Sequence, residues 1–259
     1  MQYFIYSVVI FLSTLLGAFV GLGGGVIIKP MLDALHMHTL SEISFFSSCA
    51  VFAMSVTSTA KYLKKGVSFE KRILLPLSAG AVLGGFLGNR AFSAALQSAQ
   101  SADAVKGMQS ATLCALLFCV LIFVNVRTKT ARLQNPIGIL CAGLLLGALA
   151  AFLGIGGGPI NVAALTLLFS FSVRDAAVYS VAVIFFSQLS NLGIQLLRGG
   201  VQNYDLKMLL AVIPCAVVGG LLGAVLNRKC SEKAARITFS LAIFSMVILT
   251  LYNTVTAFC

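Results

Sequence analysis

Two glycine triplets are the residues of this sequence whose type and spacing point most directly to chemistry. They are the last three residues of the segments GLGGG and GIGGG: Gly23, Gly24, Gly25, Gly156, Gly157 and Gly158. A glycine inside a helix costs about 1 kcal/mol relative to alanine, so three in a row predict that the helix is interrupted. The amides exposed at such a break, and the positive end of the helix that restarts after it, can hold an anion without a full charge.

Two long apolar runs, 41–63 and 174–197, carry polar side chains that could complete such a site. Gln188 and Asn191 are the strongest candidates, because they are bulky, lie three residues apart on one helical face and need partners inside a membrane. A hydroxyl in a membrane helix more often bonds its own backbone, so each Ser or Thr is a weaker candidate. The predicted substrate-binding side chains are Ser55, Thr57, Ser187, Gln188, Ser190 and Asn191.

Charged and nucleophilic residues add little to this site. Lys29, directly after the first break, could attract an anion at the cytoplasmic entrance or could snorkel to the interface. We find no nucleophile–base arrangement, no HExxH and no metal-ligand spacing, and the seven cysteines lie mostly within apolar runs, as small hydrophobic residues do. We therefore expect no catalytic residue, metal or cofactor. None of the seven acidic residues is predicted at a mid-helix position, so we expect no carboxylate within the membrane.

The elements that position these residues are predicted to be membrane helices. Charged residues make up 10% of the chain and apolar residues 59%, whereas a soluble domain is about a quarter charged. The apolar runs are 17 to 24 residues long, and about 20 helical residues span a bilayer core. The predicted fold class is thus an all-α polytopic membrane protein in the lipid bilayer. Its excess of basic residues indicates membrane orientation and not a nucleic-acid partner.

An internal repeat organises the predicted helices. GLGGG and GIGGG are 133 residues apart, and Glu42 and Asp175, at the same offset, each belong to a capping box that begins a long run. The chain divides into a first membrane repeat (1–127), a cytoplasmic linker (128–136) and a second membrane repeat (137–259), which form one integrated domain. About five segments are predicted in each repeat, at 3–20, 26–38, 41–63, 72–96 and 105–126, then at 137–153, 159–171, 174–197, 207–227 and 236–256.

The positions of the basic residues favour two inverted repeats. If each broken helix only bends, the 18 Lys and Arg divide 10 to 8 between the two sides, but if it turns back they divide 14 to 4. The positive-inside rule then makes the richer side cytoplasmic and places both termini outside, in a plasma (inner) membrane protein. Whether segments 26–38 and 159–171 cross or re-enter the membrane, and whether the chain forms a homo-oligomer, stays open.

Inverted repeats with paired broken helices are typical of secondary transporters, which bind substrate near the midplane and work by alternating access. A passive anion channel would share these breaks, and an intramembrane enzyme is a further alternative. Other glycines have the four-residue spacing of close helix crossings: Gly80, Gly84 and Gly88, and Gly143 and Gly147.

Residues 21–30, GLGGGVIIKP, resemble the GxGGGxxxxP signature of the TauE/SafE-type sulfite exporter (TSUP) family of membrane permeases. The resemblance covers essentially the whole chain, including Lys64-Lys65-Gly66-Val67 and Ser190-Asn191-x-Gly193. It implies an exporter of a small anion, such as a sulfur oxyanion or an organosulfonate. The second copy departs from the signature, because Pro159 follows Gly158 directly. Ser47-Ser48 stand where many relatives carry an Asn-Lys-like pair, so a cationic anchor is missing there.

We expect Asn191→Ala and Gly157→Leu each to abolish transport while the protein still reaches the membrane. The first removes a predicted donor, and the second places a bulky side chain in a glycine break. Flux of radiolabelled sulfite, thiosulfate or a sulfonate into liposomes measures the effect. Normal transport by both variants would show that the site lies elsewhere.

Overall fold

The computed structural model describes the chain except residues 1, 36, 99–101, 126–131, 198–203 and 259, and the described residues are helical apart from short connections. The first half contains α1 (Gln2–Val20), α2 (Gly25–Ala34), α3 (Leu40–Lys64), α4 (Lys71–Ser98) and α5 (Ala102–Asn125). The second half contains α6 (Pro136–Leu153), α7 (Gly158–Phe169), α8 (Val173–Leu197), the short 3₁₀ helix η2 (Leu206–Met208), α9 (Leu209–Lys229) and α10 (Glu232–Phe258).

This set of helices confirms the predicted all-α polytopic membrane protein. Eight of them are long and apolar enough to cross a membrane, and α2 and α7 are the two short helices among the described α-helices. Large apolar side chains, such as Phe4, Leu145 and Leu210, are exposed on the outside of the bundle, as expected of a surface that faces lipid. The ten predicted segments each correspond to one of the helices α1 to α10.

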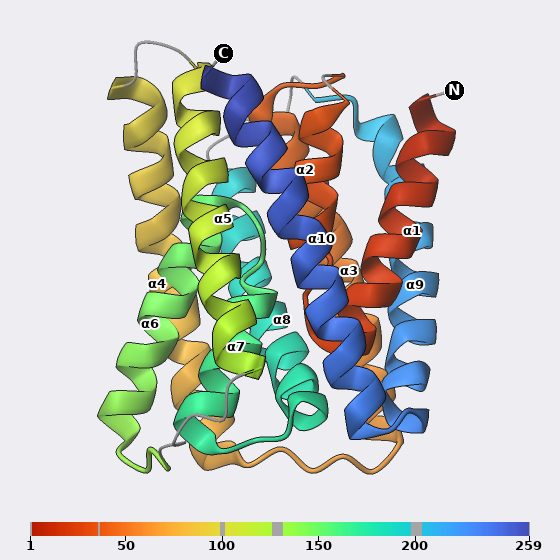
Figure 1. Cartoon of the computed structure of the whole chain (residues 1–259), viewed down its shortest axis with the longest axis vertical. Coiled ribbons are helices and arrows are strands. Elements are labelled where there is room, and N and C mark those ends of the chain that lie inside the picture. Colours follow the sequence, from red (N-terminus) through yellow and green to blue (C-terminus); the bar gives the residue numbers. More distant parts are fainter. Residues whose placement is uncertain (1, 36, 99–101, 126–131, 198–203, 259) are drawn as a thin grey trace.

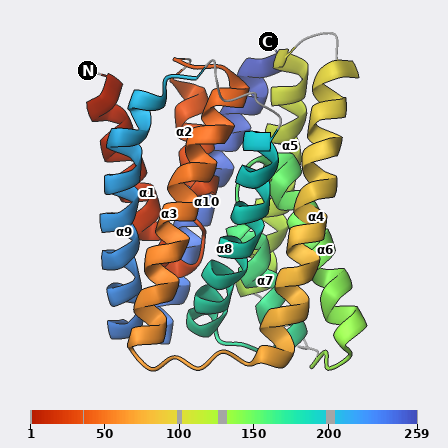
Figure 2. The ribbon, with the colours of Figure 1, turned by 180° about the vertical axis from the view of Figure 1, so that it is seen from behind.

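The two broken helices enter the bundle from opposite ends. Both chain ends lie at one end of the bundle, from which α1 starts and toward which α2 returns (Figure 1). α6 starts at the other end, and α7 returns there (Figures 1 and 2). Each short helix therefore turns back toward the end of the bundle from which the preceding helix starts. Residues 132–136 of the predicted linker lie at this second end, and residues 128–131 lie outside the described part of the chain.

Local sequence signals set the helix starts. The Thr39 hydroxyl accepts from the Glu42 amide, and the Glu42 carboxylate accepts from the Thr39 amide at 2.9 Å, which confirms the first capping box. In the second repeat, the Ser172 hydroxyl accepts from the Asp175 amide at 3.1 Å. Asn135 caps α6, whose first residue is Pro136. Each cap satisfies an amide that the first helical turn leaves without a partner.

Both helix breaks depend on glycine. The same three positions of each copy have left-handed backbone that other residues rarely adopt: Gly21, Gly23 and Gly24 with φ of +79°, +74° and +69°, and Gly154, Gly156 and Gly157 with φ of +65°, +74° and +79°. α1 therefore ends at Val20 and α6 at Leu153, as predicted for helices interrupted at a glycine triplet.

The two breaks pack directly against each other. A Cβ at Gly25 would overlap the carbonyl oxygen of Ile155, and a Cβ at Gly158 would overlap that of Leu22. Because Gly25 and Gly158, like Leu22 and Ile155, differ by 133 in number, these two contacts are exchanged by the repeat. Phe52 and Phe185, related by the same offset, stack with ring centroids 5.6 Å apart. Such reciprocal contacts are typical of a twofold arrangement.

Glycines also bring pairs of long helices into backbone contact. A Cβ at Gly84 would overlap the carbonyl oxygen of Leu144, and one at Gly147 would overlap that of Ala81, so α4 and α6 cross closely. The other predicted glycines of this seam, Gly80, Gly88 and Gly143, are equally tight. α9 approaches α1 in the same way, with Gly223 against the carbonyl oxygen of Leu15. The predicted packing role of these glycines is confirmed.

Basic side chains gather at the end of the bundle opposite the chain termini, where α3 and α9 end and α4, α6, α8 and α10 begin (Figure 1): Lys61, Lys64, Lys65, Lys71, Arg72, Arg132, Arg174, Arg228, Lys229, Lys233 and Arg236. The predicted position of Lys29 at the cytoplasmic entrance is wrong. Lys29 is 3% exposed inside the bundle and not at the entrance, because α2 folds back into the protein. Asp33, one turn further, is 4% exposed, so a carboxylate does lie in the interior.

We expect Gly84→Ala to lower the thermal stability of the detergent-solubilised protein, because the added methyl group must push α4 away from α6. Overpacking of this kind costs about 1–3 kcal/mol. Gly193→Ala is the matched control, since a Cβ on this α8 residue meets no atom within 4 Å. A melting temperature unchanged by Gly84→Ala, or lowered equally by both substitutions, would contradict the packing of this seam.

Candidate anion-binding site

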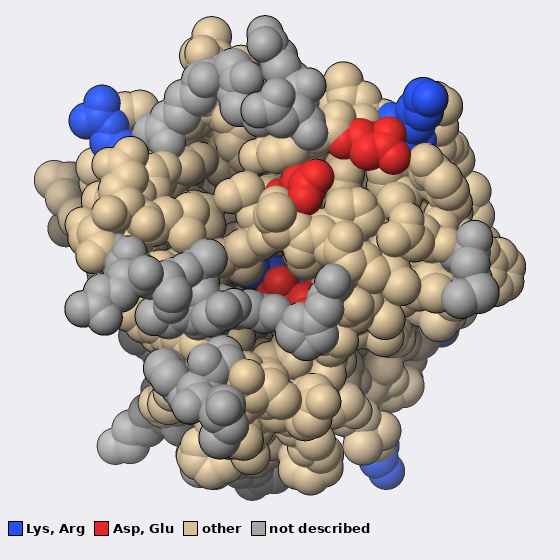
Figure 3. Space-filling view, turned by 90° about the horizontal axis from the view of Figure 1, so that it is seen from above, with Lys and Arg blue, Asp and Glu red and all other residues tan. Residues whose placement is uncertain are grey.

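A polar cavity lies between the broken α6 and the end of the bundle that carries the chain termini. Its volume is about 160 Å³, well below that of pockets for drug-sized ligands, which start at about 300 Å³. The view from this end shows a hollow in the middle of the face (Figure 3). The cavity is lined by Ser41, Ser44, Ser48, Asn89, Phe92, Ser93, Leu96, Gln109, Ala151, Phe152, Gly154, Asn191, Gln195 and Tyr204.

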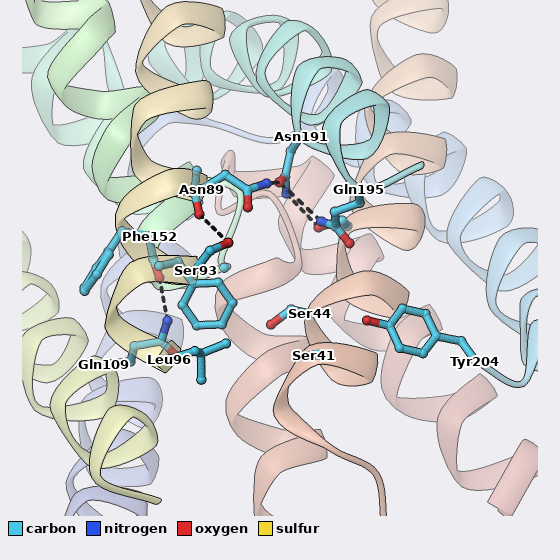
Figure 4. A pocket seen from close by; sticks show the side chains of 14 residues that line it. Ser41, Ser44, Asn89, Ser93, Leu96, Gln109, Phe152, Asn191, Gln195 and Tyr204 are labelled. Atoms are coloured by element: carbon cyan, nitrogen blue, oxygen red, sulfur yellow. Dashed lines mark hydrogen bonds between the residues drawn. The ribbon is translucent and has the colours of Figure 1, made fainter. Parts of the chain in front are cut away.

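An amide network fixes one wall of the cavity (Figure 4). The side-chain oxygen of Asn191 accepts hydrogen bonds from Asn89 at 2.7 Å and from Gln195 at 3.2 Å. The Asn191 amide nitrogen donates to the Ser48 hydroxyl at 3.0 Å. Helices α3, α4 and α8 are thereby joined through one buried side chain. Because an amide nitrogen has two protons, Asn191, Asn89 and Gln195 each keep a second proton besides the one donated within this network.

Two hydroxyl groups on the α3 side complement the amides. The Ser44 hydroxyl is buried and has no hydrogen-bond partner, so it can turn its proton toward a ligand. Tyr204, which precedes η2, packs against α3, with its ring centroid 5.3 Å from that of Phe45, and lines the cavity on that side (Figure 4). Burial, followed by the nearby Glu42 carboxylate, raises the pKa of the Tyr204 phenol, which therefore stays protonated at neutral pH. Both groups can donate to an oxyanion.

A cation lies directly behind the cavity wall. The Lys29 ammonium donates to the side-chain oxygen of Gln109 and to the carbonyl oxygen of Leu153, both at 2.7 Å. The Leu153 carbonyl is available because α6 ends there, and the negative end of a helix favours a cation. A Cβ built at Gly154 would lie 3.0 Å from the Lys29 nitrogen and 3.3 Å from the Ser44 oxygen. Ammonium and hydroxyl thus flank the same glycine of the cavity wall.

The predicted glycine triplets do not line this cavity. Gly25 and Gly158 are packed on carbonyl oxygens of the opposite break, so the space between the two breaks is filled by backbone. Gly23 faces the side chain of Ile184, and Gly156 faces Val51 and Gln188. The breaks therefore shape the site indirectly. The second break ends α6 at the cavity floor, and the first turns α2 so that Lys29 lies directly behind that floor.

The predicted polar residues divide into two groups. Asn191 alone among them lines the cavity. Four hydroxyls bond nearby carbonyl groups instead: Ser55 to Phe52, Thr57 to Ala53 and Met54, Ser187 to Ile184, and Ser190 to Val82. Gln188 is 3% exposed behind the wall, and its side-chain oxygen has no partner. The structure brings no second member of the predicted set to the cavity.

Sequence reasoning missed several wall residues. Ser44 and Ser48 belong to the polar run 41–63, where hydroxyl content gave a signal but no means of choosing among them. Asn89 follows the glycine-rich stretch of α4, and this isolated amide in an apolar run was a usable signal. Gln109 and Tyr204 had none, because they reach the cavity only through the packing of α5 and the segment before η2.

The lining chemistry suits an anion. Donors face the cavity from several sides, Lys29 lies behind its wall, and none of its lining residues carries a carboxylate. Within the described part of the chain, no three His, Cys, Asp or Glu side chains are placed to hold a metal ion.

Comparison with known proteins gives two findings. The profile of the family described as "Sulfite exporter TauE/SafE" matches residues 6–250. The chain is 26% identical over 266 residues to the "Probable membrane transporter protein YunE" of Bacillus subtilis (strain 168), a match that covers 90% of this chain and 91% of that protein. No solved structure matches the chain significantly.

We expect Ser93→Cys to react with a membrane-impermeant methanethiosulfonate about tenfold faster than Ala177→Cys, because thiol reactivity follows access. Ser93 is on the cavity wall, whereas Ala177 is fully buried against Gly21. The comparison requires a background in which the seven native cysteines are replaced. Equal labelling rates would contradict a cavity that is open at this end and closed at the other.

Proposed function

Because the chain belongs to the sulfite exporter TauE/SafE family of membrane transporters, we propose that it is a secondary transporter of a small anion, of the sulfur-oxyanion or organosulfonate class. The observation that carries the proposal is the small cavity lined by hydroxyl and amide donors, with the Lys29 ammonium beside its floor. Membership of the family supports transport, and the chemistry of the cavity supports the charge of the substrate.

The donors of the cavity can replace part of the hydration shell of an oxyanion. Ser44 and Tyr204 supply hydroxyl protons, and Asn191 and Gln195 supply amide protons from the opposite wall. Neutral donors release an anion more readily than several direct charges would, which a transporter needs. We propose that the positive charge of Lys29, which lies next to Gly154 and close to Ser44, raises the affinity of the cavity for the anion. The Lys29 ammonium can do so while its hydrogen bonds to Gln109 and Leu153 stay in place.

The proposed mechanism is alternating access between two inverted repeats. Support comes from the exchanged contacts of Gly25 with Ile155 and of Gly158 with Leu22, and from the opposite directions of the two hairpins. In transporters of this architecture, one repeat or bundle rocks against the other around a site near the midplane. The seams between α4 and α6 and between α9 and α1 each join a helix of one repeat to a helix of the other, and their backbones touch. The rocking bodies would therefore be bundles that contain helices of both repeats.

The two ends of the bundle fit an outward-open state. If the basic end is cytoplasmic, as the positive-inside rule requires, the cavity opens to the outside. At the basic end, the residues that correspond to this cavity wall in the repeat are tightly packed. Ala177 corresponds to Ser44 and is packed on Gly21, and Val181 corresponds to Ser48 and packs in a buried cluster with Tyr62. Export would require this cluster to separate in the inward-open state.

We expect wild-type protein in liposomes to transport thiosulfate or methanesulfonate, and Lys29→Gln to lower the apparent affinity at least about tenfold. A unit charge roughly 6 Å from the anion, at an effective dielectric constant of about 20, contributes on the order of 3 kcal/mol, which is more than enough for such a factor. Radiolabelled flux into proteoliposomes, compared with empty vesicles, measures both effects.

Lys207→Gln serves as the control for this experiment, since Lys207 is an exposed cation at the same end of the bundle, outside the cavity lining. Absence of flux of sulfite, thiosulfate and sulfonates above empty vesicles would exclude the proposed function. Equal losses in Lys29→Gln and Lys207→Gln would indicate surface attraction and would exclude a role of Lys29 in the site.

A further inference from the structure

The basic end of the bundle carries another open cavity, which the proposed transport does not use. It lies where α4 and α6 begin (Figures 1 and 2), and its volume is about 520 Å³, within the range of about 300–1,000 Å³ for ligand sites. None of its lining residues belongs to the polar cavity. The cavity is lined by Lys71, Arg72, Leu75, Pro76, Gln134 and Pro136.

The crossing of α4 and α6 accounts for the position of this basic cavity. The glycine contacts that hold the two helices together begin at Leu77 on α4 and at Leu140 on α6. All the lining residues precede these positions, so they lie where the two backbones no longer touch. The chain before α6 is fixed on both sides of Gln134. The Leu133 amide donates to the Leu168 carbonyl at 2.8 Å, and Asn135 caps α6.

The charged part of the lining suits a phosphate group. Lys71 and Arg72 are exposed and supply two cations, and the planar guanidinium of an arginine can bind two oxygens of one phosphate. The side-chain amide of Gln134 can donate from the other wall. Because α4 begins at Lys71, the positive end of this 28-residue helix lies at the same place and adds to the attraction of an anion.

No described acid neutralises these cations. Within the part of the chain that the structure describes, neither Lys71 nor Arg72 forms an ion pair. Glu70, the acid next to them in sequence, is exposed and does not line the cavity. Residues 126–131 lie outside the described part, and the charged residues among them, Arg127 and Lys129, are both basic. The charge of the lining is therefore positive.

The apolar part of the lining continues onto the lipid-facing surface of the bundle. Leu75 lines the cavity and is 59% exposed, and Ile137, next to the lining residue Pro136, is 71% exposed. Exposed leucines follow on the same two helices, at Leu83 and Leu87 on α4 and at Leu145 on α6. A small soluble anion gains nothing from such a surface, whereas a phospholipid can place its acyl chains along it.

We propose that the basic cavity binds an anionic phospholipid, with the phosphate group at Lys71 and Arg72 and the acyl chains along the exposed faces of α4 and α6. The positive-inside rule assigns this end of the bundle to the cytoplasmic leaflet, which carries the anionic lipids. Basic pockets between membrane helices on this side are typical sites for their headgroups. The inference does not depend on the proposed transport, because the polar cavity lies at the other end.

Native mass spectrometry of the full chain in a neutral detergent tests the proposal. Phosphatidylglycerol is the probe, and phosphatidylcholine with the same acyl chains is the reference lipid. We expect the wild type to bind phosphatidylglycerol at least about tenfold more tightly. Replacing both cations, by Lys71→Gln with Arg72→Gln, is expected to remove this preference, because two basic groups near a membrane surface account for such a factor.

Two further variants make the result specific to the cavity. Lys229→Gln with Lys233→Gln is the matched control, since it removes the same charge from two exposed residues at the same end, outside the lining. It is expected to keep the preference. Gln134→Glu places a negative charge in the lining at an exposed position and is expected to weaken phosphatidylglycerol binding about tenfold. This variant decides the question if the first does not fold.

The outcomes distinguish the possible ligands. Equal binding of phosphatidylglycerol and phosphatidylcholine by the wild type would overturn the recognition of an anionic headgroup. Equal losses in the two double variants, or unchanged binding by Gln134→Glu, would overturn the assignment to this cavity. Glycerol 3-phosphate carries the phosphate without acyl chains and is expected to compete only at concentrations at least about a hundredfold higher. Competition at equal concentration would identify a site for a soluble phosphate and overturn the lipid.

Discussion

The interrupted end of α6 is the feature on which the site depends. A helix that stops inside a protein leaves carbonyl groups without partners, and these must be satisfied by donors from elsewhere in the chain. The carbonyl of Leu153 is taken by the Lys29 ammonium and that of Phe152 by the Gln109 amide. One backbone break thereby holds a cation in the interior and places α2 and α5 around a polar cavity.

The corresponding break in the first repeat is satisfied without charge, which makes the two ends of the bundle chemically different. Asn227 donates to the carbonyl of Phe19 at 2.7 Å, and the Tyr62 hydroxyl donates to that of Ala18 at 2.9 Å. Val162 stands at the repeat position of Lys29, and Ala177 stands at that of Ser44. In the part of the duplicated scaffold that the structure describes, the polar cavity thus lies at one end, and its equivalent at the basic end is closed by small and apolar side chains.

Local signals in the sequence were sufficient for the helices and insufficient for the site. Apolar run length, the caps at Thr39 and Ser172 and the glycine spacing of α4 act over a few residues, so the helix order, the breaks and the close crossings could be predicted. The cavity depends on contacts between distant residues, such as the bonds from Lys29 to residues 80 and 124 positions away. Asn191 was predicted as a bulky amide in an apolar helix, whereas Lys29 was misplaced because its surroundings follow from the direction in which α2 returns.

The position of a bound anion tests the central claim most directly. An experimental structure of the full chain, determined with a heavy oxyanion such as selenite and read by its anomalous signal, would locate the ion without any variant. A peak is expected in the polar cavity, within hydrogen-bonding distance of Asn191 or Ser44 and on the side of Gly154 that faces Lys29. A peak elsewhere in the bundle, or an empty cavity at a concentration that saturates transport, would contradict an anion site at the end of α6.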